Sequence, residues 1–141
     1  MKRFFTILFI ALAMCISTTS CEKNNEDNIS DYASVIEGTY VGTIMIKEQN
    51  GLDWDTFKGA KLIVKRSSNE FAIVDFSFAN DEKIFDEPSI YEIEKFGDLY
   101  MLNSDESTIE EIRILKGAAS ATGYVYTDTV LLTFSFEGNK Q

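Results

Sequence analysis

The ionisable side chains of this chain limit the chemistry that it could perform. The chain contains no histidine, which removes serine–histidine and cysteine–histidine catalysis and the commonest transition-metal ligand. It has no Gly-rich phosphate-binding loop and no cluster of cysteines that could bind zinc. Its 23 acidic residues make chance carboxylate pairs abundant, whereas a glycosidase needs a pair at a set separation in a shaped cleft. We therefore expect a protein that is not an enzyme and that carries no cofactor.

Carboxylates could instead bind calcium. Three groups are candidates: Asp53 with Asp55, Asp81-Glu82 with Asp86-Glu87, and Asp105-Glu106 with Glu110-Glu111. None of them has the ligand spacing of an EF-hand loop. Runs of charge of this kind are more often a solvated surface, so we expect no metal site.

Exposed aromatic side chains are the remaining candidates for binding. Trp54 is the only tryptophan and lies between two aspartates, just past the turn signal Asn50-Gly51. A loop tryptophan in such a place suits sugar stacking or a protein-binding hot spot; alternatively, it folds as a lid over one end of the domain. Tyr124 and Tyr126 share one face of a predicted strand, where they either fill the core or line a pocket.

The first 21 residues have the features of a secretory signal. Lys2 and Arg3 give a basic start, an apolar run follows from Phe4 to Ile16, and small polar residues then precede Cys21. The apolar run is shorter than the roughly 20 residues that a membrane-spanning helix needs. We therefore assign residues 1–21 to a signal segment.

The residues around Cys21 resemble the lipobox of bacterial lipoproteins, in which the cysteine becomes the lipidated first residue. Thr18 and Ser20 stand where that motif usually has Leu and Ala or Gly; such a threonine is tolerated in Bacteroidetes-like lipoproteins. A second candidate, Cys15, lies inside the apolar run. The alternative is a secreted protein cut near Ser20, which would leave an unpaired thiol. The resemblance implies a lipid anchor at Cys21 in the outer membrane of the cell envelope, on its periplasmic or surface face.

The residues that follow the signal divide into a tether and a single domain. Residues 22–34 begin with a polar, acidic stretch that we expect to be a disordered tether, and residues 35–138 suffice for one domain. Without Lys2 and Arg3, the chain has 11 basic against 23 acidic residues, a formal charge of −12. This charge argues against nucleic acid as a partner, because phosphate binding needs a basic surface.

Beyond residue 35, apolar and polar residues alternate with period two, which is typical of strands. The alternating segments are 39–47, 61–66, 70–78, 89–96, 99–103, 119–127 and 130–137. The connections between them are too short for parallel crossovers. The sequence therefore predicts an all-β antiparallel meander of about eight strands that closes into a small barrel, either filled by side chains or holding one small ligand.

Residues 104–115 fit two structures. Ser107 followed by Glu110 suits a capping box before a short helix, whereas Ile112 and Ile114 favour a strand. We expect a strand from about Ile109 to Leu115.

The first and last strands carry a family resemblance. Gly38-Thr39-Tyr40-Val41-Gly42-Thr43, and the closing hairpin of 123–126 with 130–136, resemble the calycin-like β-barrel lipoproteins of Bacteroidetes. The resemblance covers roughly residues 35–138 and implies a lipocalin-related barrel of eight strands on a lipid anchor. Lipocalins carry Gly-x-Trp on the first strand, and Tyr40 stands at that tryptophan position. We expect Tyr40 to close the floor of the barrel.

Two functions follow as hypotheses. The first is binding of a small apolar or amphipathic ligand at the open end of the barrel, with Trp54, Tyr40, Tyr124 and Tyr126 as the candidate binding residues. The second is an interaction module with a filled barrel, which binds a protein or a glycan through the Trp54 loop. In both, the membrane is a partner through the lipid anchor.

Overall fold

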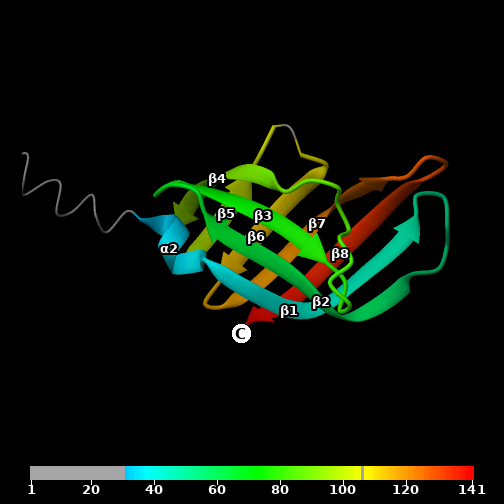
Figure 1. The fold of residues 1–141 in the computed structure, drawn as a ribbon, viewed down its shortest axis with the longest axis horizontal. Coiled ribbons are helices and arrows are strands. Elements are labelled where there is room, and N and C mark those ends of the chain that lie inside the picture. The colour runs from blue at the N-terminus through cyan, green and yellow to red at the C-terminus, as the bar shows by residue number, and fades with distance from the viewer. Residues whose placement is uncertain (1–30, 106) are drawn as a thin grey trace, which may run out of the picture. The chain divides into compact units, whose positions relative to one another are not determined.

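The computed structural model describes residues 31–105 and 107–141, and within them eight antiparallel strands follow one another in chain order and close a ring (Figure 1). The strands are β1 (Gly38–Glu48), β2 (Asp55–Arg66), β3 (Phe71–Ser77), β4 (Ser89–Phe96), β5 (Leu99–Asn103), β6 (Ile109–Leu115), β7 (Ala118–Tyr126) and β8 (Leu131–Lys140). The predicted all-β meander that closes on itself is confirmed. The signal segment, Cys21 and residues 22–30 of the tether lie outside the described residues.

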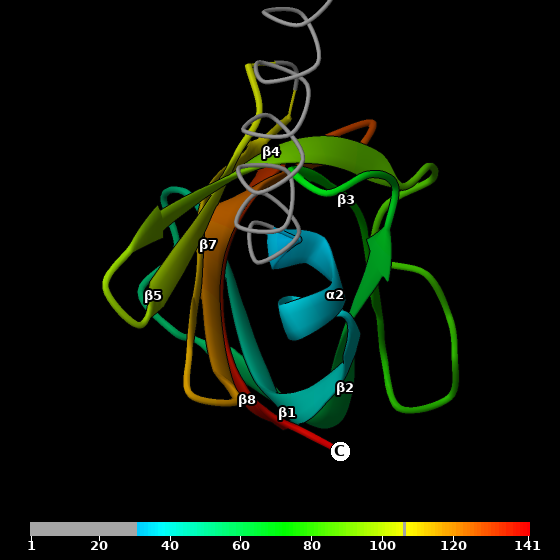
Figure 2. The ribbon, with the colours of Figure 1, turned by 90° about the vertical axis from the view of Figure 1, so that its left-hand side faces the viewer.

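A short helix, α2 (Tyr32–Ile36), precedes the first strand. Figure 2 looks along the barrel from the α2 end and shows α2 across the opening of the ring of strands. Ala33 and Ile36 are buried against the core, and the Ala33 amide donates a hydrogen bond to the Asn69 carbonyl oxygen at 3.1 Å. The placement of residues 32–34 in a disordered tether is therefore wrong. Two apolar residues three positions apart lie on one face of this single helical turn, and they pack α2 against the core at this end of the barrel.

Phenylalanine rings fill the interior of the barrel. Phe76 packs edge-to-face against Phe134 and Phe136, with ring centroids 5.6 and 5.5 Å apart, and Phe85 lies 5.9 Å from Phe76. Phe76, Phe134 and Phe136 are all completely buried. Such tilted contacts stabilise aromatic pairs beyond the area that they bury.

Strand β7 makes room for these rings because its inward positions are small. Ala121 and Gly123 lie opposite Phe136 and Phe134 in the register of β7 with β8. A Cβ atom on Gly123 would lie 3.0 Å from the ring of Phe134 and 2.6 Å from the backbone oxygen of Thr108. The pairing of large with small residues lets the rings fit inside a narrow barrel.

Strand β2 begins six residues earlier than the alternation predicts, at Asp55 instead of residue 61. Gly59 has a φ of +76°, and the register of β1 with β2 shifts between Gly42 and Thr43. Such an irregularity interrupts the period of two, so the sequence pattern hides the first half of the strand. Strand β8 also continues past the predicted stop, to Lys140, which pairs with Tyr40.

Residues 104–115 fitted either a short helix or a strand, and the structure has the strand. Strand β6 spans Ile109–Leu115, as predicted. The side chain of Ser107 does not cap a helix. Its hydroxyl accepts a hydrogen bond from the Ile109 amide at 3.0 Å and shares another with the Tyr91 hydroxyl. A local side-chain bond of this kind competes with helix formation.

Candidate functional site

Tyr40 lies at the end of the barrel that α2 covers. Its side chain is completely buried, and its hydroxyl donates a hydrogen bond to the Ile36 carbonyl oxygen at 2.7 Å. Burial raises the pKa of Tyr40 to about 12, because the phenolate would lose its hydration. Tyr40 thus occupies the end of the barrel, where the sequence placed it, and presents no surface to a ligand.

Tyr124 and Tyr126 lie on the outer surface of the barrel. In β7 the inward residues alternate with them, and Tyr126 is 69% exposed at the end of the strand. The expectation that these tyrosines fill the core or line an interior pocket is wrong. Large apolar side chains usually lie on the buried face of a strand. Here the small residues of β7 face inward, because they leave space for the phenylalanines of β8, and the tyrosines therefore face outward.

Trp54 lies just before β2, and the residue is 41% exposed. The ammonium group of Lys47 lies 4.9 Å from the centre of the indole ring, a distance at which a cation is attracted to the face of the ring. The neighbour of Lys47 in β1, Ile46, packs against the core, so Lys47 points to the outer face. Trp54 therefore lies beside the outer face of the sheet and is not a lid over the barrel.

The hairpins β1–β2 and β7–β8 run together to the end of the barrel opposite α2 (Figure 1). The Gln49 amide donates a hydrogen bond to the Leu131 carbonyl oxygen at 2.9 Å, which joins the two connections. Four apolar or aromatic side chains are exposed there, and we name them the tip patch: Leu52, Trp54, Tyr126 and Val130. Leu52 is 96% exposed, although an apolar side chain of that size gains nothing from contact with water.

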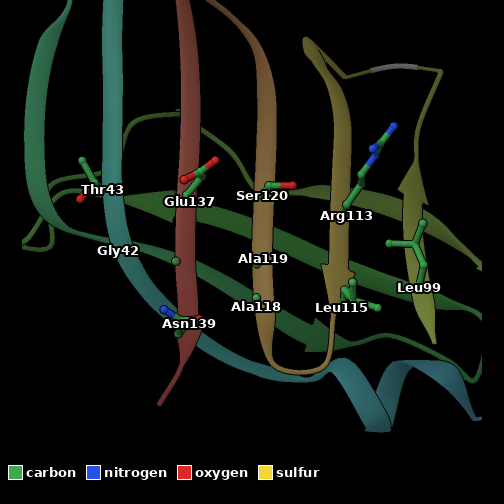
Figure 3. Close-up of a pocket in the computed structure, with 11 residues that line it drawn as sticks. Gly42, Thr43, Leu99, Arg113, Leu115, Ala118, Ala119, Ser120, Glu137 and Asn139 are labelled. Carbon is green, nitrogen blue, oxygen red and sulfur yellow. The ribbon is translucent and has the colours of Figure 1, made fainter.

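A shallow groove of about 690 Å³ crosses the outer face of the same strands (Figure 3). Four polar residues form a row across it, since Thr43 of β1 pairs with Glu137 of β8, Glu137 pairs with Ser120 of β7, and Ser120 pairs with Arg113 of β6. Small residues below the row, among them Ala118 and Gly138, make the groove.

The groove was not predicted from the sequence. The period-two pattern contained the signal, because Ser120 alternates with buried alanines. Only the register between four strands shows that these polar positions lie side by side.

Several charged residues around the barrel form ion pairs on its surface. The Arg113 guanidinium lies 2.6 Å from the Glu111 carboxylate, and the Lys61 ammonium lies 2.6 Å from the Asp81 carboxylate. Pairs this exposed contribute little to stability. Among the described residues, no three cysteine, aspartate or glutamate side chains gather closely enough to hold a metal ion.

Comparison of the chain with protein-family models, with curated proteins and with solved structures found no match in any of the three. No helix among the described residues is long and apolar enough to cross a membrane.

Proposed function

We propose that this chain is a lipid-anchored module of the cell envelope that binds a protein or a glycan through Trp54 and the tip patch. The observation that carries the proposal is the partly exposed Trp54, whose ring contacts the Lys47 ammonium beside the outer face of the sheet. Tryptophan is the residue most enriched at binding hot spots, because its large rigid ring loses little entropy when it is covered.

The state of the barrel interior favours this function over binding of a small apolar ligand. A ligand-binding barrel keeps its interior open, with pockets of a few hundred cubic ångströms or more. Here the rings of Phe76, Phe134 and Phe136 meet in the interior, and Tyr40 with α2 occupies one end. The exposed apolar side chains gather outside instead.

The positions of the two barrel ends support an anchored binding module. Whatever precedes Tyr32 joins the domain at the α2 end, whereas the tip patch lies at the far end of β1 (Figure 1). The 11 residues of β1 span about 33 Å at 3.3 Å per residue. An anchor at Cys21 would therefore hold the α2 end and leave the tip patch free to meet a partner. The closed meander of eight strands likewise supports a calycin-like lipoprotein.

Photo-crosslinking in cells tests the binding proposal directly. A photoreactive amino acid at Leu52, which is 96% exposed, should give a discrete adduct that disappears when Trp54→Ala is added. The control places the same amino acid at Phe96, which is 56% exposed in another hairpin. Identical adducts from both positions, or an adduct that survives Trp54→Ala, would contradict the proposal.

The anchor has its own test. Cys21→Ser removes the only thiol that the lipobox-like sequence offers for acylation, so the variant should move from the membrane fraction to the soluble fraction. Cys15→Ser is the control and should remain in the membrane. A Cys21→Ser protein that stays in the membrane fraction would exclude lipidation at this residue.

A further inference from the structure

The outer face of β1, β8 and β7 carries hydroxyl groups in successive rows. The row of Thr43 and Ser120 crosses the groove, and the next row along the strands pairs Met45 with Ser135 and Ser135 with Thr122. The hydroxyls of these four Ser and Thr residues make no hydrogen bond within the part of the chain that the structure describes. Each hydroxyl can both donate and accept, so the face offers many hydrogen bonds to a ligand.

A third row ends in aromatic rings. Lys47 pairs with Thr133, and Thr133 pairs with Tyr124, while the Trp54 ring lies against the Lys47 ammonium. Tyr124 and Lys47 are two strand spacings apart, about 10 Å. The row of Thr43 lies four residues along β1 from the row of Lys47, about 13 Å away. A ligand that covers both the rings and the groove is therefore an extended chain.

The charges of this face differ from those of the whole protein. The chain carries a formal charge of −10, but on the outer face of β1, β7 and β8 one cation, Lys47, accompanies one anion, Glu137. Lys58 of β2 pairs with Thr43, and Arg113 and Glu111 of β6 pair with Ser120 and Thr122 beside this face. An acidic polymer would meet the negative field of the rest of the molecule. A basic partner would find stronger attraction elsewhere on the surface.

We infer that this outer face binds a neutral polysaccharide chain, which stacks on Trp54 and continues through the groove between Thr43 and Arg113. This inference rests on the proposed function and specifies its partner as a glycan. Sugar rings present C–H groups on their faces, which pack against aromatic rings, and hydroxyls at their edges, which suit the Ser and Thr rows. The near balance of charge fits a ligand without charge.

Fluorescence of the full chain tests the inference, because Trp54 is the only tryptophan. Soluble mannan, β-glucan, xylan and glycogen are the neutral probes, and alginate and polygalacturonate are the acidic ones. At least one neutral polymer should shift the Trp54 emission to shorter wavelength in a saturable way, and the acidic ones should not. Affinity electrophoresis through gels that contain each polymer gives a second readout, which also serves variants without tryptophan.

A groove-filling variant separates the inference from the proposed function. Ser120→Tyr places a ring in the groove from an outward position and should weaken binding at least about tenfold, which is 1.4 kcal/mol. Glu94→Tyr is the matched control, since Glu94 is exposed on β4; its affinity should be that of the wild type. Trp54→Ala should abolish retention in the gel.

The outcomes distinguish the two proposals. If Trp54→Ala abolishes binding to a neutral polymer but Ser120→Tyr does not weaken it, the tip patch binds and the groove inference is wrong. Binding to acidic polymers alone also overturns the inference, as does a failure of every neutral polymer while Leu52 crosslinks to a protein. If no polymer binds and no Trp54-dependent adduct forms, both proposals fail.

Discussion

The hydroxyl of Tyr40 links the barrel to the end of α2. Its hydrogen bond reaches Ile36, the last residue of the helix, and both residues are buried. A buried carbonyl that loses its donor costs about 1 to 3 kcal/mol. The last residue of α2 is thus held by one side chain, which makes the protonation state of Tyr40 relevant to stability.

We expect stability to fall above pH 10 because of Tyr40. Burial raises its pKa from 10.0 to about 12, so the folded state holds the proton more tightly than the unfolded chain. The resulting stability is complete below pH 10 and is lost as the pH rises towards 12. Urea unfolding from pH 8 to 11.5 should show equal slopes below pH 10, and above pH 10 a fall in stability that is steeper for the wild type than for Tyr40→Phe by about 1 kcal/mol per pH unit.

The same variant provides the neutral-pH comparison. At pH 8, Tyr40→Phe should be less stable than the wild type by about 1 to 2 kcal/mol, because the Ile36 oxygen loses its partner. Equal alkaline slopes in the two proteins would show that Tyr40 ionises as easily in the folded state as in the unfolded chain.

Trp54 should be dispensable for folding. The residue is 41% exposed, and its ring makes a cation–π contact with Lys47, an interaction of about 0.5 to 1 kcal/mol at an exposed site. Trp54→Ala should therefore lower the unfolding free energy by no more than about 1 kcal/mol, as measured by urea denaturation followed by circular dichroism. Lys47→Met removes the cation alone and should account for part of the change. A Trp54→Ala protein that is unfolded would make this residue structural and remove it from the binding proposal.

At the scale of the elements, β7 shows how a strand without large inward residues still belongs to the core. Its alanines and Gly123 bury little area themselves, but they admit the rings of Phe134 and Phe136 from β8. The neighbouring strand supplies the apolar area, and β7 supplies the space.

A methyl group at Gly123 should therefore be costly. Its Cβ would lie 2.6 Å from the Thr108 oxygen and 2.7 Å from the Ile109 Cα, and backbone atoms cannot move aside as a side chain can. Gly123→Ala should lose about 2 kcal/mol or more. Gly97→Ala is the control: nothing lies within 4 Å of its Cβ, so only its φ of 61° opposes the change, at about 1 kcal/mol. Comparable losses in urea unfolding would contradict the account of β7 packing.

The sequence predicted those strands in which one face is clearly more apolar than the other. In β3 and β8 the buried residues Val74, Phe76, Phe134 and Phe136 are the alternating ones, so periodicity was sufficient. It failed in the first half of β2, where Gly59 interrupts the period. It also assigned Tyr124 and Tyr126 to the wrong side, because the inward choice in β7 depends on the strand beside it.

The candidate site was predictable only in part. Trp54 was identified from its place beside a turn, which is a local property. The groove at Thr43 and Ser120 requires the register of four strands, and no local pattern specifies which outward residues meet across them. The helix α2 escaped prediction because five residues are too few for a helical period to show.

At the scale of the whole molecule, the phenylalanine cluster determines whether the barrel interior has space for a ligand. Phe134 touches both Phe76 and Phe85, with centroids 5.6 and 5.8 Å apart. Removal of this ring should leave an apolar cavity that stays dry and accepts a small aromatic molecule.

Phe134→Ala should therefore acquire a property that the wild type lacks. We expect it to lose about 3 to 5 kcal/mol and to bind benzene, as detected by NMR shifts of interior methyl groups, while the wild type and Phe96→Ala show none. Phe134→Leu leaves a smaller cavity and serves if the alanine variant does not fold. Benzene shifts of equal size in the wild-type interior would revive the hypothesis of an apolar ligand inside the barrel.

The pairing of β1 with β8 has a consequence for the time at which the protein can fold. Tyr40 pairs with Lys140, a hundred residues further along the chain, so the first strand lacks a partner on one side until the last strand is available. Contacts of such long sequence separation slow folding. A chain that is exported as we propose would thus remain unfolded, and able to pass through a narrow secretion channel, until nearly all of it has crossed. The pairing of the first strand with the last would therefore delay folding until export is nearly complete.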